Sequence, residues 1–121
     1  MEEQRVNFIT HKNKRILLID FTGVMPEDHT PIVARIKSMV SNEPKGSALT
    51  IIDATGMRLG LKMAQSLKDL ANEDKPYVRA SAVVGVDGPL GLLMEGVEKF
   101  SGRTFQRHAS REQALDWLAS Q

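Results

Sequence analysis

The chain has 121 residues, of which 41% are hydrophobic and 26% charged, a composition typical of one globular domain covering residues 1–121. With 16 basic and 15 acidic residues the formal net charge is +1, which argues against a nucleic-acid partner. The absence of cysteine excludes disulfides and thiolate metal sites and fits the cytoplasm, and the apolar run at residues 16–19 is too short to be transmembrane.

The first part of the chain predicts an antiparallel hairpin followed by a helix. Residues 5–11 alternate between apolar and polar side chains, and residues 15–21 contain a continuous apolar run. The short segment between them includes Asn13, which tolerates a left-handed backbone, so the two strands are expected to be adjacent. Thr30 followed by Pro31 predicts a helix start, with Thr30 as its N-cap.

Strands and helices then alternate to the end of the chain. Strands are expected at residues 48–52, 77–86 and 104–106, and helices at about 59–72, at 89–100 and after a capping box at 110–113. This order predicts an α/β fold with a mixed sheet of about five strands, the later ones parallel, covered by about four helices. The expected core residues are Ile19, Ile36, Ile51, Leu67, Val83, Val97 and Leu118.

Three glycine-containing loops should emerge at the carboxyl ends of the strands, where ligands gather in open α/β sheets. They comprise residues 21–25, 53–58 and 85–88. The candidate ligand-binding or regulatory residues on them are Thr22, Gly23, Asp53, Thr55, Gly56, Arg58, Gly85 and Asp87.

The most suggestive of these loops contains Asp53, Thr55 and Gly56. A hydroxyl and a glycine ahead of a helix are typical of an anion site at a helix N-terminus. Thr55 is also a candidate phosphorylation site, where a phosphoryl group would add about −1.5 to −2 charge. The alternative is purely local, since Asp and Thr often cap turns and Gly permits positive φ.

Enzyme motifs are missing from the sequence, which contains no G-x-S-x-G, Walker A or H-E-x-x-H pattern. His11, His29 and His108 do not have the spacing of metal ligands, and His29 is expected to be a solvated turn residue. No metal and no cofactor are expected. An alternative function as a small hydrolase-type enzyme would use Asp53 and Asp87 as an acid/base pair on neighbouring loops.

Methionines near the same loops raise a further alternative. Met25, Met57 and Met63 have flexible side chains that adapt to irregular ligands, which is typical of a carrier of lipids or small apolar molecules. Ordinary packing in the core would account for the same residues.

The helix expected at residues 89–100 has one surface feature that indicates self-association. On a helical wheel Leu92 falls outside the apolar arc and lies beside Gly96. Glycine destabilises a helix by about 1 kcal/mol relative to Ala, so close approach of a second backbone would explain it. We therefore expect Leu92 and Gly96 to contribute to a homodimer contact. The arc expected to face the sheet contains Leu90, Leu93, Met94, Val97 and Phe100.

Several segments together carry a family resemblance. They are residues 16–21 followed by Gly23, Leu-Thr-Ile-Ile-Asp-Ala-Thr-Gly at 49–56, Ala-Val-Val-Gly at 82–85, and Phe105 with Ala-Leu-Asp-Trp-Leu at 114–118. In this order they resemble the STAS-like, anti-sigma-factor-antagonist (SpoIIAA-like) family, and in particular its bacterial branch of small stand-alone proteins. The resemblance also implies an affinity of that branch to the lipid-binding CRAL-TRIO domain.

The resemblance implies a STAS-like fold and a non-catalytic regulatory or ligand-binding module. Its partner would be a protein, a small molecule or a lipid. Antagonists of this family carry a phosphorylatable Ser in an Asp-Ser-x-Gly turn, and Thr55 before Gly56 is the nearest match, with Ala54 standing between Asp53 and Thr55.

Overall fold

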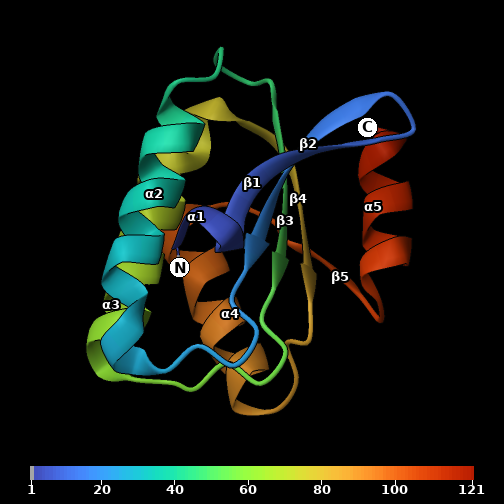
Figure 1. The fold of residues 1–121 in the computed structure, drawn as a ribbon. Helices are drawn as coiled ribbons and strands as arrows, with labels where there is room; N and C mark the ends of the chain where they lie inside the picture. Colours follow the sequence, from blue (N-terminus) through green and yellow to red (C-terminus); the bar gives the residue numbers. More distant parts are fainter. Residues whose placement is uncertain (1) are drawn as a thin grey trace.

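Five strands form one mixed sheet (Figure 1). The computed structural model describes residues 2–121, with side chains from Gln4 onward. The strands are β1 (Val6–His11), β2 (Lys14–Asp20), β3 (Ala48–Asp53), β4 (Val78–Val84) and β5 (Gln106–His108). They are arranged in chain order, β1 and β2 as an antiparallel hairpin and β2 to β5 in parallel.

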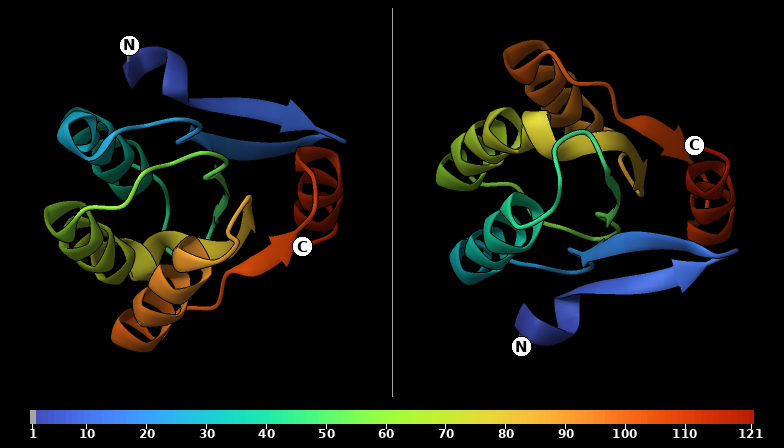
Figure 2. Two further views of the ribbon diagram at one scale, coloured as in Figure 1. Left: turned by 90° about the horizontal axis from the view of Figure 1, so that it is seen from below. Right: turned by 90° about the horizontal axis from the view of Figure 1, so that it is seen from above.

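Helices cover both faces of the sheet (Figure 2). One face carries α2 (His29–Ser41), α3 (Leu61–Asp74) and α4 (Pro89–Ser101), and the other carries α5 (Arg111–Ala119). A short helix, α1 (Glu2–Arg5), leads into β1, and single 3₁₀ turns at Pro26–Asp28 and Lys75–Tyr77 flank the helical layer. The expected α/β fold, a mixed five-stranded sheet with four longer helices, is confirmed.

The central strand β3 shows why the apolar runs are nearly continuous. Side chains alternate between the two faces of a strand, so Leu49 and Ile51 pack with Leu118 of α5, whereas Ile52 packs against the three-helix layer. Since both faces are covered by helices, both sets of positions must be apolar. Six of the seven expected core residues are buried, namely Ile19, Ile36, Ile51, Val83, Val97 and Leu118.

The hairpin turn has the geometry that its strands require. Lys12 and Asn13 both have positive φ, +49° and +67°. Two consecutive residues of this kind form a primed turn, whose twist matches that of the flanking strands. The expected hairpin is confirmed, and Asn13 occupies a left-handed position.

The start of α2 differs from the expectation at Thr30. The helix begins at His29, its N-cap position is Asp28, and no side chain caps it. The preceding 3₁₀ turn at Pro26–Asp28 continues directly into the helix, so no extended cap residue is needed. His29 is therefore turned inward and buried, with Nδ1 2.5 Å from the Pro26 carbonyl oxygen and Nε2 3.2 Å from Ser66 Oγ. The prediction of a solvated His29 is wrong.

Two apolar predictions are also corrected. Phe100 is 52% exposed, because the inward line of α4 passes through Val97 and Ser101, whose hydroxyl donates to the Val97 carbonyl at 2.7 Å. Leu67 is half-buried because it borders a cavity between the sheet and the helices.

Segment boundaries shift by a few residues elsewhere. The second long helix begins at Leu61 rather than at residue 59, and the last strand is Gln106–His108 rather than 104–106. The helix after β5 begins as expected, with Ser110 Oγ accepting a hydrogen bond from the Gln113 amide at 3.2 Å. No helix among residues 2–121 has the length and apolar character needed to cross a membrane.

The packing of β3 predicts a large effect of truncating Ile51, which has no exposed surface. Ile51→Ala removes contacts to α5 and leaves a cavity, so we expect the free energy of unfolding to fall by about 2–5 kcal/mol. Chemical denaturation measures it. Leu61→Ala is the matched control, because Leu61 is 93% exposed and should change stability by less than about 0.5 kcal/mol. A loss below about 1 kcal/mol at Ile51 would contradict this placement of β3.

Candidate functional site

The three loops predicted to hold a site meet at one edge of the sheet. β2, β3 and β4 all point toward the bottom of Figure 1, and the left view of Figure 2 shows this edge from below. The Gly23 amide donates to the Thr55 carbonyl at 3.0 Å, and the Arg58 amide donates to the Val24 carbonyl at 2.9 Å. The loops after β2 and β3 are therefore joined by backbone hydrogen bonds.

Two neighbouring strands end in the same four-residue turn. Its sequences are Asp20-Phe21-Thr22-Gly23 after β2 and Asp53-Ala54-Thr55-Gly56 after β3. In the first turn, Asp20 Oδ1 accepts from the Thr22 amide at 2.9 Å and from its hydroxyl at 2.5 Å. In the second, Asp53 Oδ1 accepts from the Thr55 amide at 3.0 Å and from its hydroxyl at 2.7 Å. We call this pair of turns the Asp-x-Thr-Gly doublet.

Glycine is required at two places in this arrangement. Gly56 closes its turn with φ of +72°, and a Cβ there would lie 3.6 Å from the Gly23 amide nitrogen. Gly85, at the end of β4, has φ of +78°, and a Cβ there would lie only 2.7 Å from the Thr55 amide nitrogen. A side chain at position 85 would therefore displace Thr55, so Gly85 permits the third loop to pack on the doublet.

A single arginine joins the two turns from the other side of the sheet. Arg111 is the first residue of α5, directly after the capping Ser110. Its Nε donates to Asp53 Oδ2 at 2.6 Å, and its terminal nitrogen lies 3.3 Å from Asp20 Oδ1. Arg5 adds hydrogen bonds to the Asp20 and Thr22 carbonyls at 3.1 and 3.0 Å. The start of α5 thus holds both strand ends in place.

The electrostatics keep both carboxylates ionised. Burial of Asp53 acts to raise its pKa, but hydrogen bonds from Thr55 and Arg111 outweigh burial and lower that pKa below its ordinary value. The pKa of Asp20 is lowered in the same way, by Thr22, Arg111 and Arg5 against the effect of burial. The hydrogen bond to Asp53 raises the pKa of Arg111.

This geometry speaks against the acid/base pair of Asp53 and Asp87. Asp53 points to the face covered by α5, and its oxygens are engaged by Thr55 and Arg111. Asp87 is exposed in the loop after β4, and in the described part of the chain no hydrogen bond joins its side chain to Asp53. A carboxylate held ionised by an arginine is a structural group rather than a proton donor at neutral pH.

Thr55 is exposed, but it does not lie at a helix N-terminus as expected. α3 begins six residues later, at Leu61, behind an extended Gly60 that packs against Pro26. The hydroxyl of Thr55 donates to Asp53, so its oxygen keeps its lone pairs for a ligand or a phosphoryl group. The predicted anion site at a helix start is therefore wrong. The side chain of Arg58 is exposed on the same loop.

Three residues of the site were not found by reading the sequence: Asp20, Arg5 and Arg111. The repeat Asp-x-Thr-Gly, visible at residues 20–23 and 53–56, was the available signal for Asp20. Arg111 is 58 residues from Asp53 along the chain. Only its position after the helix cap indicates that it lies at the edge of the sheet.

The other candidate residues do not take part in the hydrogen bonds between the aspartates and threonines of the doublet. Met57 and Met63 are buried in the core, and Met25 is 43% exposed. Leu92 is 71% exposed, whereas a Cβ on Gly96 would lie 3.5 Å from Cε of Lys68 on α3. A Cβ at this distance would make an ordinary van der Waals contact, so packing within the chain does not require glycine here, and the homodimer stays a prediction. Residues 4–121 contain no group of His, Asp and Glu side chains arranged to hold a metal ion.

Comparison with solved structures is informative about the fold. No protein-family model matches the sequence, and no curated protein matches it. Among solved structures, an anti-sigma-factor antagonist (STAS) domain protein from Planctomyces limnophilus superposes with a TM-score of 0.63. The alignment covers 93% of this chain and 96% of that chain at 10% sequence identity.

The chain has the STAS fold. This confirms the fold implied by the sequence resemblance. At 10% identity the likeness is one of backbone architecture, so the membership of a bacterial stand-alone branch stays a prediction. The STAS fold accounts for the hairpin at the start, the parallel strands and the helix on the opposite face.

The Arg111 contacts predict a stability loss in Arg111→Met. The side chain of Asp53 is 8% exposed and would lose its counter-charge, while Arg111 itself is 39% exposed. We expect a fall of about 2–4 kcal/mol in the free energy of unfolding, slightly below that of a fully buried pair. Arg79→Met, at an exposed position of β4, is the control and should change little.

The same pair predicts a pH dependence. A lowered carboxyl pKa contributes stability that is present above the unfolded pKa and lost as the pH falls through the folded pKa. The stability difference between wild type and Arg111→Met should therefore be full at pH 7 and shrink below about pH 4. Denaturation at several pH values measures this, and an equal difference at pH 3 and pH 7 would show that the charge pair is not its source.

Proposed function

We propose that this STAS-fold domain is a non-catalytic regulatory module that binds a partner protein at the carboxyl edge of its sheet, with Thr55 as the regulated residue. The observation that carries the proposal is Thr55, an exposed residue whose hydroxyl donates a hydrogen bond to an ionised Asp53. The similar solved structure is an anti-sigma-factor antagonist domain, and such a protein is consistent with this role.

The edge around Thr55 has the composition of a protein-binding surface. Beside the polar doublet, the contact between Gly60 and Pro26 is flanked by three apolar side chains, Met25, Leu59 and Leu61, which are 43%, 41% and 93% exposed. Large apolar side chains next to polar, hydrogen-bonding groups are typical of surfaces that bind other proteins. We expect these apolar side chains to provide the contact area for the partner protein, and modification of Thr55 to regulate its binding.

Phosphorylation of Thr55 would act on this edge through two physical effects. The phosphorylated oxygen has no proton, so the 2.7 Å hydrogen bond to Asp53 would be lost. The added charge, about −1.5 to −2, would repel Asp53 and compete for Arg111. Both effects loosen the second turn while the sheet below it stays folded, which is the behaviour required of a local switch.

Variants of the two equivalent threonines test the proposal. Thr55→Glu should weaken partner binding at least tenfold because it places a charge at the exposed edge, whereas Thr55→Ala should bind more like the wild type. Thr22→Ala and Thr22→Glu are matched controls in the first turn of the doublet, where Thr22 is half-buried. Leu61→Asp should also weaken binding if the apolar side chains contribute.

The measurement uses a partner that co-purifies with the wild-type chain and is then produced separately for titration by calorimetry. Circular dichroism of each variant checks that the domain is folded. Wild-type affinity in both Thr55→Glu and Thr55→Ala would refute a switch at this position. An effect confined to the Thr22 variants would assign the control to the first turn instead.

A further inference from the structure

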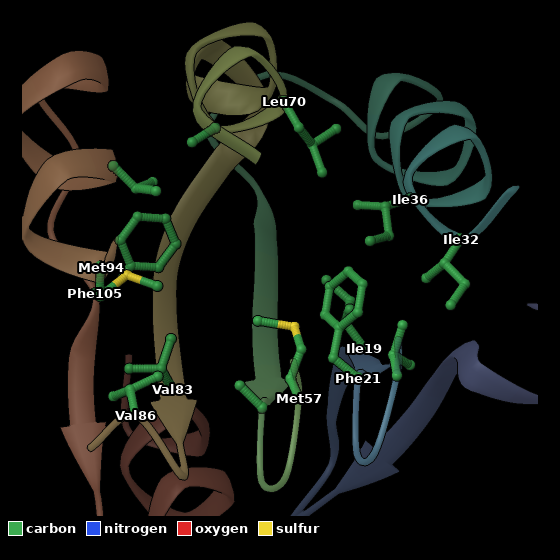
Figure 3. Close-up of a cluster of buried hydrophobic side chains, with 14 of the residues drawn as sticks. Ile19, Phe21, Ile32, Ile36, Met57, Leu70, Val83, Val86, Met94 and Phe105 are labelled. Atoms are coloured by element: carbon green, nitrogen blue, oxygen red, sulfur yellow. The ribbon is translucent and has the colours of Figure 1, made fainter. Parts of the chain in front are cut away.

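A cavity of about 60 Å³ lies between the sheet and the helical layer. Apolar side chains form nearly all of its lining, and several of them, including Phe21, Met57, Met94 and Phe105, appear in Figure 3 between the strands and the helices. Its polar lining side chains are those of Thr50, Asp74 and Arg103. A cavity of this size holds about two water molecules, or a hydrocarbon group of about two carbons.

The packing around this cavity is loose for the centre of a domain. Ile52 lies in the central strand and faces three helices, yet it is only half-buried. Leu67 of α3 and Leu93 of α4 line the same cavity and are half-buried as well. Protein interiors are normally packed as densely as organic crystals, so an apolar occupant would improve the packing here.

One end of the cavity holds a carboxyl group without a partner. Asp74 is 5% exposed, and in the part of the chain that the structure describes no hydrogen bond or ion pair reaches its side chain. Burial raises the pKa of Asp74 to about 7, with a smaller opposing effect of Arg103. The other charged groups facing it are Glu73 and Lys37, which pair with each other at 2.8 Å.

Arg103 brings a positive charge to the same end. Its two terminal nitrogens donate to the Ala71 carbonyl at 3.2 Å and to Ser81 Oγ at 2.7 Å, and its guanidinium lies 4.5 Å from the centre of the Phe105 ring. No carboxylate among the described residues pairs with it. A guanidinium has five N–H donors, so donors remain for an additional acceptor.

We propose that this cavity binds a short aliphatic monocarboxylic acid, with the chain among the apolar side chains and the carboxylate between Arg103 and Asp74. A carboxylate accepts hydrogen bonds from the guanidinium and from a protonated Asp74, and it neutralises the buried positive charge. An ammonium group would be repelled by Arg103. An alcohol would leave the charge of Arg103 unpaired. The closed cavity is smaller than a four-carbon acid, so a chain of this length fits only if the helices move apart.

The pH dependence of this binding has a defined sign. The ligand remains ionised above pH 6, whereas Asp74 must be protonated to donate to it, and its pKa is about 7. Butyrate should therefore bind roughly tenfold more tightly at pH 6 than at pH 8. For a ligand of so few atoms, a dissociation constant on the order of 1 mM is expected at pH 6.

The test is a titration of the full chain with sodium butyrate, followed by the methyl NMR signals of Leu67, Leu93 and Met94. Asp74→Asn keeps a neutral side chain at this place, so it should bind butyrate equally at pH 6 and pH 8. Asp69→Asn, an exposed position on the same helix, should keep the wild-type pH dependence. Arg103→Gln, checked for folding by circular dichroism, should bind at least tenfold more weakly.

Saturable shifts of these methyl signals with this pH dependence would support the proposal. Absence of saturable shifts with butyrate at pH 6 in the folded wild type would overturn it. Equal or tighter binding of butylamine or butanol would also overturn it, since the head group would then not be an anion. An identical pH dependence in wild type and Asp74→Asn would show that Asp74 does not contact the ligand, which would contradict the proposed binding mode.

Discussion

The interaction on which this edge of the molecule depends is the bridge from Arg111 to Asp53 and Asp20. Parallel strands end side by side, so two identical turns that each begin with an aspartate bring two negative charges close together. Without a cation between them, these carboxylates would repel each other and shift toward protonation. Arg111 removes that repulsion, and its place at the first position of α5 also anchors the helix on the opposite face of the sheet.

The bridge from Arg111 also determines the hydrogen bonding of Thr55. Because Asp53 stays ionised, it can accept two hydrogen bonds from Thr55, one from the amide and one from the hydroxyl. Gly85 allows this threonine to pack against the end of β4. The turn is thus held by several contacts, although Thr55 is an exposed residue. A chemical change at this oxygen alters a charged hydrogen-bond network and not only a surface side chain.

Asp74, unlike Asp53, is a buried carboxyl group without a counter-charge bonded to it in the described part of the chain. This difference is why we propose a structural role for Asp53 and a ligand-binding role for Asp74. Asp53 and Asp74 are both buried. Asp53 is neutralised by Arg111 and its pKa is lowered, whereas Asp74 has no bonded partner and its pKa rises to about 7. The first carboxylate stabilises a turn, and the second faces a cavity that an external group can fill. Phe21 and Ala54, the second residues of the two turns, also line that cavity, so the two regions are in direct contact.

Hydrophobic periodicity was sufficient to predict the architecture, because β3 and β4 must be apolar on both faces and the helices must present one apolar stripe each. Glycine-containing loops after the strands were sufficient to predict that Gly23, Thr55 and Gly85 meet. The contacts of Arg111 and the burial of His29 could not be predicted, since they depend on which helix covers which face and on the residue where α2 begins. The prediction that Phe100 faces the sheet failed for a related reason. A helical wheel gives the direction of a side chain around the helix axis but does not show where the helix extends beyond the sheet.

The most direct test of the central claim is amide hydrogen exchange in the chain carrying phosphothreonine at position 55. The amides of Gly23 and Thr55 are both bonded within the doublet. If the Thr55 hydroxyl and Arg111 together hold this edge, both amides should exchange faster after phosphorylation, while amides in the middle of β3 and β4 keep their protection. Unchanged protection of Gly23 and Thr55 in the phosphorylated chain would contradict the account.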